Sequence, residues 1–168
     1  MQRLFNHEYL IDTLSLLECT VETDAWTYTL KAVNEFFIKP VDPHLLHMEV
    51  SFDGISLIDQ AGDGIIFSTP AGSTAYNLSA GGSILYQTLK GYQIRAVSPI
   101  KSKRYSSLPS SIVVPSTSVC ELKFDINDAN RIMIVNDGIV NKYRGIKRIT
   151  LSSPDETIQR IVFDKDLY

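Results

Sequence analysis

The stretch that decides the fold is residues 62–82, GDGIIFSTPAGSTAYNLSAGG. It is rich in glycine and in hydroxyl residues, whereas long apolar runs lie on both sides of it. A short apolar segment, GIIFST, leads to Pro70, which fixes φ and lacks a backbone N–H. We therefore expect a strand that ends at this proline, followed by a sharp turn at Ala71 and Gly72.

After this turn, the sequence TAYNLSA predicts a short helix. Ser73 or Thr74 is a natural N-cap for it, and Gly81 and Gly82 can end it with a left-handed residue. A strand, a tight turn and a helix N-terminus together direct backbone N–H groups toward one place, which favours polar or anionic groups. The residues alone leave two interpretations open: they serve only the turn and the cap, or they bind a ligand.

Three phosphate-binding or nucleophile motifs do not fit this stretch. It matches neither GxGxxG, which would predict a Rossmann turn, nor GxxxxGK[ST], which would predict a P-loop. It is not a GxSxG elbow either, since Ser73 lacks the flanking pattern and no histidine is placed to activate it.

The rest of the chain predicts mostly strands. LSLLECTVE and WTYTLKAVNEFFIK are rich in β-branched and aromatic residues, and Asp-Gly turns at 53–54 and 137–138 predict hairpins. Helical periodicity is confined to the first ten residues and to 73–90, where the two adjacent glycines would break it. We expect a mainly β domain, with two packed sheets in a β-sandwich and one or two short helices.

Composition restricts the class of partner and compartment. The 168 residues carry a net charge of −3, so nothing indicates nucleic-acid binding, and the basic cluster Lys101, Lys103 and Arg104 is expected in a solvated loop. No apolar run of about 18 residues predicts a membrane span, and the N-terminus lacks a signal-peptide core. Cys19 and Cys120 lie in apolar runs, which predicts buried free thiols in a reducing cytoplasm. CxxC and HExxH are absent, so we expect no metal site.

Three motifs together resemble the NAD kinases, the enzymes that phosphorylate NAD to NADP. DGIIFSTPAGSTAYNLSAGG is similar to the long Asp-Gly to Gly-Gly segment of that family. Upstream, AVNEFFI resembles its Asn-Glu motif at the end of a strand, and downstream IVNDG resembles an Asp-Gly of the same family. The motifs follow the family's order, and the resemblance covers about residues 10–165.

The resemblance implies which residues contact NAD. Asn34 and Glu35 would hydrogen-bond ribose hydroxyls or nearby base atoms, and Asp63 would contact the nicotinamide-bearing end. Without the resemblance, Asn34 and Glu35 could form an exposed strand edge, and Asp63 could be a turn residue between two glycines.

The same resemblance implies an adenine pocket on the predicted helix. Thr74, Ala75 and Tyr76 would line it, and Ser79 would face it from one helical turn further on. Without the resemblance, Tyr76 could be an ordinary core aromatic residue. The secondary positions of the pocket are Ser73, Ser98 and Asp137.

The family's catalytic motif is not matched here. Family members carry an N-terminal α/β domain whose Gly-Gly-Asp-Gly supplies the catalytic aspartate and helps to hold the triphosphate and metal. AGDG at 61–64 directly precedes IIFSTPAGSTAY, so it resembles the family's later Asp-Gly, and residues 1–33 contain no glycine. We therefore expect no catalytic residue in 1–168, which would be one domain: a linker remnant at 1–9, then the NAD-binding domain at 10–165. A final return segment after IVFDKDLY would also be missing.

The resemblance implies an activity for the full form. A phosphoryl group would pass from ATP or polyphosphate, with Mg²⁺, to the adenosine ribose 2′-hydroxyl of NAD, and this chain alone would be inactive. It also implies a cytoplasmic homo-oligomer, a dimer or tetramer, in which a neighbouring copy completes the NAD pocket. Two alternatives remain: a non-catalytic NAD(P)-binding or regulatory module, and a lipid-kinase-like domain of the same superfamily.

Overall fold

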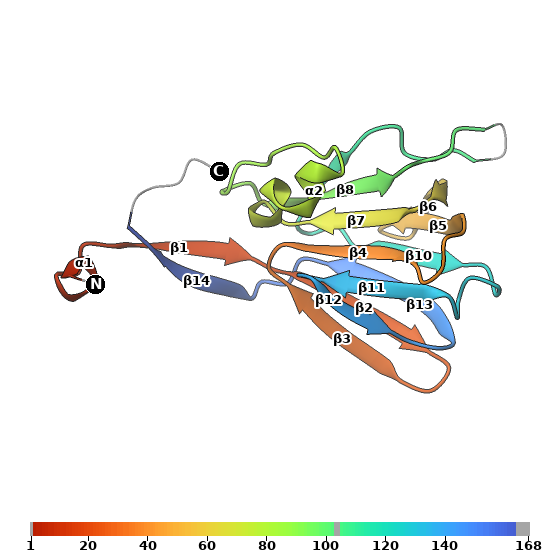
Figure 1. Cartoon of the computed structure of the whole chain (residues 1–168), viewed down its shortest axis with the longest axis horizontal. Coiled ribbons are helices and arrows are strands. Elements are labelled where there is room, and N and C mark those ends of the chain that lie inside the picture. Colours follow the sequence, from red (N-terminus) through yellow and green to blue (C-terminus); the bar gives the residue numbers. More distant parts are fainter. Residues whose placement is uncertain (1, 103–104, 164–168) are drawn as a thin grey trace.

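The chain folds mainly into antiparallel strands, as Figure 1 shows for the computed structural model. The structure describes residues 2–102 and 105–163, so Lys103, Arg104 and the tail from residue 164 lie outside it. Two six-stranded sheets pack against each other, and a two-stranded ribbon extends from them. This confirms the prediction of a mainly β fold with two packed sheets.

The first sheet has the strand order β3-β2-β13-β10-β5-β6. Its strands are β2 (Leu17–Thr23), β3 (Thr27–Ala32), β5 (Leu46–Phe52), β6 (Ile55–Gly62), β10 (Cys120–Phe124) and β13 (Ile146–Ser152). The second sheet has the order β12-β11-β4-β7-β8-β9. Its strands are β4 (Glu35–Pro40), β7 (Gly64–Ser68), β8 (Gly91–Val97), β9 (Ile112–Pro115), β11 (Ile132–Asn136) and β12 (Ile139–Lys142).

The remaining elements are short. The ribbon consists of β1 (Leu10–Ser15) and β14 (Thr157–Val162), and the described helices are α1 (Gln2–Phe5), the 3₁₀ turn η1 (Ala71–Thr74) and α2 (Tyr76–Ser79). None of these helices has the length and hydropathy that a transmembrane span requires.

The core lies between the two sheets, because alternate residues of each strand point inward. In β2, for example, Leu17, Cys19 and Val21 are completely buried, while the residues between them are partly exposed. Cys19 and Cys120 are free thiols, as expected, and burial raises the pKa of both.

Both predicted Asp-Gly hairpins are present. Asp53 and Gly54 join β5 to β6 with φ of 50° and 82°, and Asp137 and Gly138 join β11 to β12 with φ of 45° and 84°. Two consecutive left-handed residues make the turn that fits the twist of a hairpin, and aspartate and glycine tolerate them.

The prediction for 73–90 is correct only at its beginning. A 3₁₀ turn and one helical turn end at Gly81, whose φ of 83° matches the expected left-handed stop. Beyond it no helix forms, because side chains hold the chain away from helical hydrogen bonding. Gln93 binds both backbone groups of Ser83, and the Leu85 N–H donates to the Ser73 hydroxyl.

The predicted N-cap is also wrong. Ala75 occupies the N-cap of α2 and makes no side-chain cap, so neither Ser73 nor Thr74 has that role. The hydroxyl that organises the turn is that of Thr69, which accepts the Gly72 N–H at 3.0 Å. Thr69 takes this role in place of Ser73 or Thr74 because the chain forms a 3₁₀ turn directly after Pro70.

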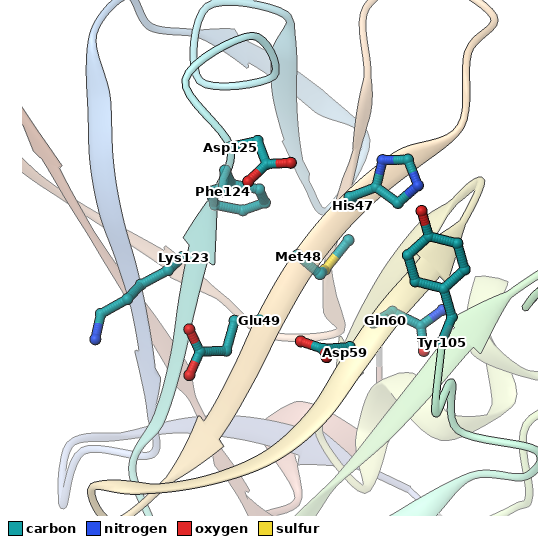
Figure 2. A pocket seen from close by; sticks show the side chains of 9 residues that line it. All are labelled: His47, Met48, Glu49, Asp59, Gln60, Tyr105, Lys123, Phe124 and Asp125. Atoms are coloured by element: carbon teal, nitrogen blue, oxygen red, sulfur yellow. The ribbon is translucent and has the colours of Figure 1, made fainter. Parts of the chain in front are cut away.

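A hollow of about 520 Å³ lies on the outer face of the first sheet (Figure 2). His47 stacks on Tyr105 at one side of it, with ring centroids 4.9 Å apart. Glu49 of β5 lies directly opposite Asp59 of the edge strand β6, so two carboxylates meet in one cross-strand pair. Like charges in such a pair are destabilising.

The Glu49–Asp59 pair gives a stability prediction. Asp59→Asn should raise the free energy of unfolding by about 0.2–1 kcal/mol, because it removes this repulsion. As a matched control, Asp12 lies opposite Arg160 in the ribbon and contacts it at 2.9 Å, so Asp12→Asn should lower stability. Urea unfolding of the three proteins measures both effects, and a loss of stability in Asp59→Asn would contradict the prediction.

Gly72 gives a second stability prediction. A Cβ at this residue would lie 2.6 Å from Asn34 Cα and closer still to the Asn34 carbonyl oxygen. Gly72→Ala should therefore cost about 3 kcal/mol, the upper range for overpacking. Gly54→Ala is the control: nothing lies within 4 Å of its Cβ, so only the left-handed strain of about 1 kcal/mol applies. Equal losses in the two variants, measured by urea unfolding, would show that the close approach is not there.

Candidate functional site

Asn34 and Glu35 lie where the chain turns from β3 into β4. Val33 and Asn34 form a bend, and Glu35 begins the next strand, so the Asn-Glu motif follows the end of one strand and starts another. The carboxylate of Asp137 accepts the backbone N–H groups of all three residues, at 2.7, 2.8 and 3.1 Å. These bonds use only backbone groups of Asn34 and Glu35, so their side chains are left for other contacts.

Thr69 holds the same bend from the other side. Its hydroxyl donates to the Val33 carbonyl at 2.6 Å, and its N–H donates to the Asn34 carbonyl at 2.9 Å. This threonine lies inside the STP motif but was not among the predicted site residues. Its role could not be found by spacing, because the bend lies 36 residues earlier in the chain.

The Glu35 carboxylate lies in an unfavourable environment for a charge. Its Oε2 atom is buried and has no hydrogen-bond partner among the described residues. Burial, and then the negative charge of Asp137, raise the pKa of this carboxyl group, while a hydrogen bond from the Tyr76 backbone N–H lowers it. A buried acceptor without a donor is costly, and this oxygen can accept a hydrogen bond from a ligand or from water.

The turn and helix of the glycine-rich stretch meet the Asn34–Glu35 bend. The backbone N–H of Tyr76 hydrogen-bonds the Glu35 carboxylate, and the Tyr76 ring packs on Phe37 with centroids 5.4 Å apart. Tyr76 and Thr74 are both exposed, and Ala75 between them is partly so. Six of the predicted residues therefore share one end of β4 and β7, and they are Asn34, Glu35, Thr74, Ala75, Tyr76 and Asp137.

Of the two predicted serines near this group, Ser79 is exposed and Ser73 is buried. Ser79 is exposed at the end of α2. Ser73 is completely buried, and its hydroxyl donates to the Pro70 carbonyl at 2.6 Å while accepting the Leu85 N–H at 2.9 Å. Both bonds are internal, so Ser73 holds the turn and the segment after α2 together.

Asn77, like Ser73, is a buried polar residue of this turn, and it was not among the predicted site residues. Its amide is fully buried and donates to the carbonyls of Ser73 and Ser83, while its Oδ1 atom has no partner among the described residues. A Cβ on Gly82 would overlap this amide, which explains why the second glycine of the pair is needed.

Asp63 and Ser98 lie at the opposite end of the same sheet. Asp63 directly precedes β7, whereas Glu35 pairs with Ser68 at the far end of that strand. Five residues of extended chain separate these ends, about 16 Å. Ser98 lies beside Asp63, since it follows Val97, whose carbonyl accepts the Asp63 N–H at 2.9 Å.

Neither group of residues forms an enclosed cavity. Asp63 lines a hollow of about 530 Å³ with Lys39, His44 and Met133. The Figure 2 hollow contains none of the predicted residues, and a third, of about 470 Å³, lies between the ribbon and residues 86–88. Within 2–102 and 105–163, no group of three or more histidine, cysteine, aspartate or glutamate residues could hold a metal ion. The larger group of predicted residues combines the exposed side chains of Thr74 and Tyr76 with the partly buried Asn34 and Glu35.

Comparison with known proteins agrees with the motifs. A family model described as the ATP-NAD kinase C-terminal domain matches residues 33–154. An NAD kinase from Finegoldia magna is 44% identical over 169 residues, which cover 98% of this chain and 62% of that protein. An NAD kinase from Streptococcus pneumoniae is 35% identical over 119 residues, 71% of this chain and 43% of the relative.

Two solved structures share the fold. The crystal structure of yeast NADH kinase complexed with NADH has a TM-score of 0.81 at 24% identity, covering 95% of this chain and 46% of that one. An NAD kinase from Archaeoglobus fulgidus in complex with ATP has a TM-score of 0.72 at 20% identity, covering 97% of this chain and 58% of that one.

The chain thus spans less than two thirds of the length of these relatives. The family model is narrower than the 10–165 expected from the motifs, so that wider domain boundary stays a prediction. The model nevertheless covers most of the chain, and the F. magna relative aligns with nearly all of it. The resemblance drawn from the three motifs is confirmed, and the chain belongs to the ATP-NAD kinase C-terminal domain family.

Proposed function

We propose that this chain is the NAD-binding part of an NAD kinase, which converts NAD to NADP by phosphorylating the adenosine ribose 2′-hydroxyl. The observation that carries the proposal is the buried, unpartnered Oε2 of Glu35 beside Asn34. A ribose hydroxyl is the kind of donor that this oxygen lacks. The names of the relatives, NAD kinase and NADH kinase, support the same ligand class.

The surrounding residues suit a dinucleotide. The Asn34 amide can both donate to and accept from ribose hydroxyls, and the ionised Glu35 accepts from them. The exposed Tyr76 ring and the small residue Ala75 offer a surface for a flat base, with the Thr74 hydroxyl as a polar contact. In this proposal Ser79 contacts the ligand from the end of α2, and Ser73 supports the turn.

Phosphoryl transfer itself is not assigned to residues of this chain. ATP or polyphosphate and Mg²⁺ are part of the proposed reaction, yet the described residues contain no group that fits a metal ion. Because phosphoryl transfer depends on positioning and on charge stabilisation, the chain by itself should form no NADP.

A homo-oligomer is part of the proposal. Asp63 and Ser98 lie at the other end of β7 from Glu35, so within one copy they are not part of the surface around Asn34 and Tyr76. A second copy could supply Asp63 and Ser98 to the surface that Asn34, Glu35 and Tyr76 form on the first. Cytoplasmic localisation belongs to the proposal too, and it agrees with the two free, buried thiols.

Glu35→Gln tests the binding role. NAD affinity should fall about 10- to 100-fold, the range for a hydrogen bond to a charged group. Stability without NAD should rise at neutral pH, because the raised pKa means that the ionised Glu35 is disfavoured in the fold. The wild-type protein should lose stability as pH rises from the ordinary glutamate range through the raised pKa, since the folded state then binds more protons than the unfolded state. Calorimetric titration and urea unfolding across pH 4–8 (a range chosen to span the glutamate pKa) measure both.

The opposite signs separate a binding role from a structural one. If Glu35 had only a structural role, Glu35→Gln would lower the stability of the protein, and that result would contradict the proposal. Asn34→Ala and Thr74→Ala should also weaken NAD binding, while Asp59→Asn on the other sheet serves as the unaffected control. If NAD binds but the chain extended by the family's remaining part forms no NADP, the regulatory-module alternative holds instead.

Mixing two variants tests the shared pocket. Asn34→Ala and Asp63→Ala should each bind NAD weakly, but an exchanged mixture should recover tight sites. In a twofold dimer, random exchange restores about a quarter of the pockets, because each mixed dimer contains one intact pair. Light scattering gives the oligomeric state, and calorimetry counts the tight sites. A mixture that binds no better than its components would exclude a pocket built from two copies.

A further inference from the structure

Every backbone N–H and carbonyl group of Val33, Asn34 and Glu35, the bend and the first residue of β4, has a hydrogen-bond partner. All three N–H groups donate to the carboxylate of Asp137. The carbonyls of Val33 and Asn34 accept from Thr69, and that of Glu35 accepts the Asp137 N–H at 3.2 Å. Two residues from distant parts of the chain thus satisfy every backbone group of the bend.

Both oxygens of the Asp137 carboxylate accept backbone hydrogen bonds from the bend. Oδ1 accepts the N–H groups of Asn34 and Glu35, and Oδ2 accepts that of Val33, at 2.7–3.1 Å. Hydrogen bonds to an ionised acceptor are about twice as strong as neutral ones. A carboxylate that holds three donors in this way is poorly suited to bind a ligand as well.

The turn that carries Asp137 is itself fixed. Its φ of 45° and the φ of 84° at Gly138 define a tight hairpin. The Asn141 amide donates to the Asn136 side chain at 2.7 Å, across the base of this hairpin. Asn136 in turn donates to the Lys31 carbonyl in β3 at 3.1 Å. The hairpin therefore presents the Asp137 carboxylate to the bend from a rigid support.

We propose that Asp137 is a positioning residue, which sets the placement of the Asn34 and Glu35 side chains through their backbone and does not contact the dinucleotide. The inference rests on the proposed function, since Asn34 and Glu35 are its NAD-binding residues. It changes the role of Asp137 from a secondary pocket residue to the support of the two principal ones.

Asp137 has a second effect on Glu35. Burial is the first cause that raises the pKa of Glu35, and the charge of Asp137 is the next. From α2, the Tyr76 N–H acts in the opposite direction, and the strand partner in β7 is the uncharged Ser68. Removing the Asp137 charge should therefore lower the pH at which Glu35 ionises.

Asp137→Asn is the test variant, and Asp53→Asn is its matched control. Both aspartates precede glycine in a left-handed hairpin turn, and asparagine tolerates that conformation. The Asp53 carboxylate, in the other sheet, accepts the Val119 N–H at 2.8 Å. Asp137→Asn should weaken NAD binding about tenfold or more, because small misplacements of binding groups are costly. Asp53→Asn should leave the affinity unchanged, although both variants lose stability.

The pH profile separates positioning from general destabilisation. NAD affinity should fall in acid as Glu35 gains a proton, and in Asp137→Asn this fall should move to lower pH. In a Glu35→Gln background, Asp137→Asn should produce no such movement. An Asp137→Asn protein that binds NAD as tightly as Asp53→Asn, with an unmoved profile, would overturn the inference.

Ligand-free measurements keep the inference testable if NAD does not bind or the variant does not fold. In the wild-type protein, the amides of Val33, Asn34 and Glu35 should be protected from hydrogen exchange, because all three donate to the Asp137 carboxylate. Unprotected amides would overturn the inference whatever the ligand is. Protected amides in a chain that fails to bind NAD would sustain the support role and reject the proposed function instead.

Discussion

The structure depends on how the chain leaves β3 at Val33 and Asn34 without losing its backbone hydrogen bonds. A bend between two strands has no ladder partner, and buried backbone groups without partners are costly. The solution is the convergence of the Asp137 carboxylate and Thr69 on three consecutive residues. This convergence also explains Gly72, since the turn after Pro70 lies so close to Asn34 that no side chain fits there. The three motifs are therefore parts of one assembly, although they are far apart in the sequence.

Much of the fold could be predicted because its signals are local. The Asp-Gly turns specify left-handed residues, and Pro70 removes a strand donor, so hairpins and the end of β7 follow from a few residues. The alternation of apolar residues in β2 likewise specifies which face is buried. The helical periodicity after Gly82 did not give a helix, because the Gln93 side chain hydrogen-bonds the backbone of Ser83 instead. Gln93 lies on a later strand, so no local signal in 83–90 indicates this contact.

The family resemblance named the residues of the candidate site, but the sequence did not predict how they are arranged. Family resemblance selected Asn34, Glu35 and Tyr76, and the structure brings these residues together. It also selected Asp63, and only the antiparallel register of β4 and β7 reveals that this residue faces the opposite end of the sheet. Spacing along the chain contains no information about that register. The supporting role of Asp137 was equally hidden, because its partners lie 102 to 104 residues earlier.

The ribbon of β1 and β14 has a mechanical consequence. Leu10 is paired with Val162 at its far end, and the ribbon projects away from both sheets (Figure 1). A pull on these two residues in opposite directions loads the interstrand hydrogen bonds one pair at a time, because antiparallel bonds run perpendicular to the strands. The ribbon would open like a zipper before any force reached the sheets. Strain applied at Leu10 and Val162 would thus be absorbed there, leaving the geometry around Glu35 undisturbed.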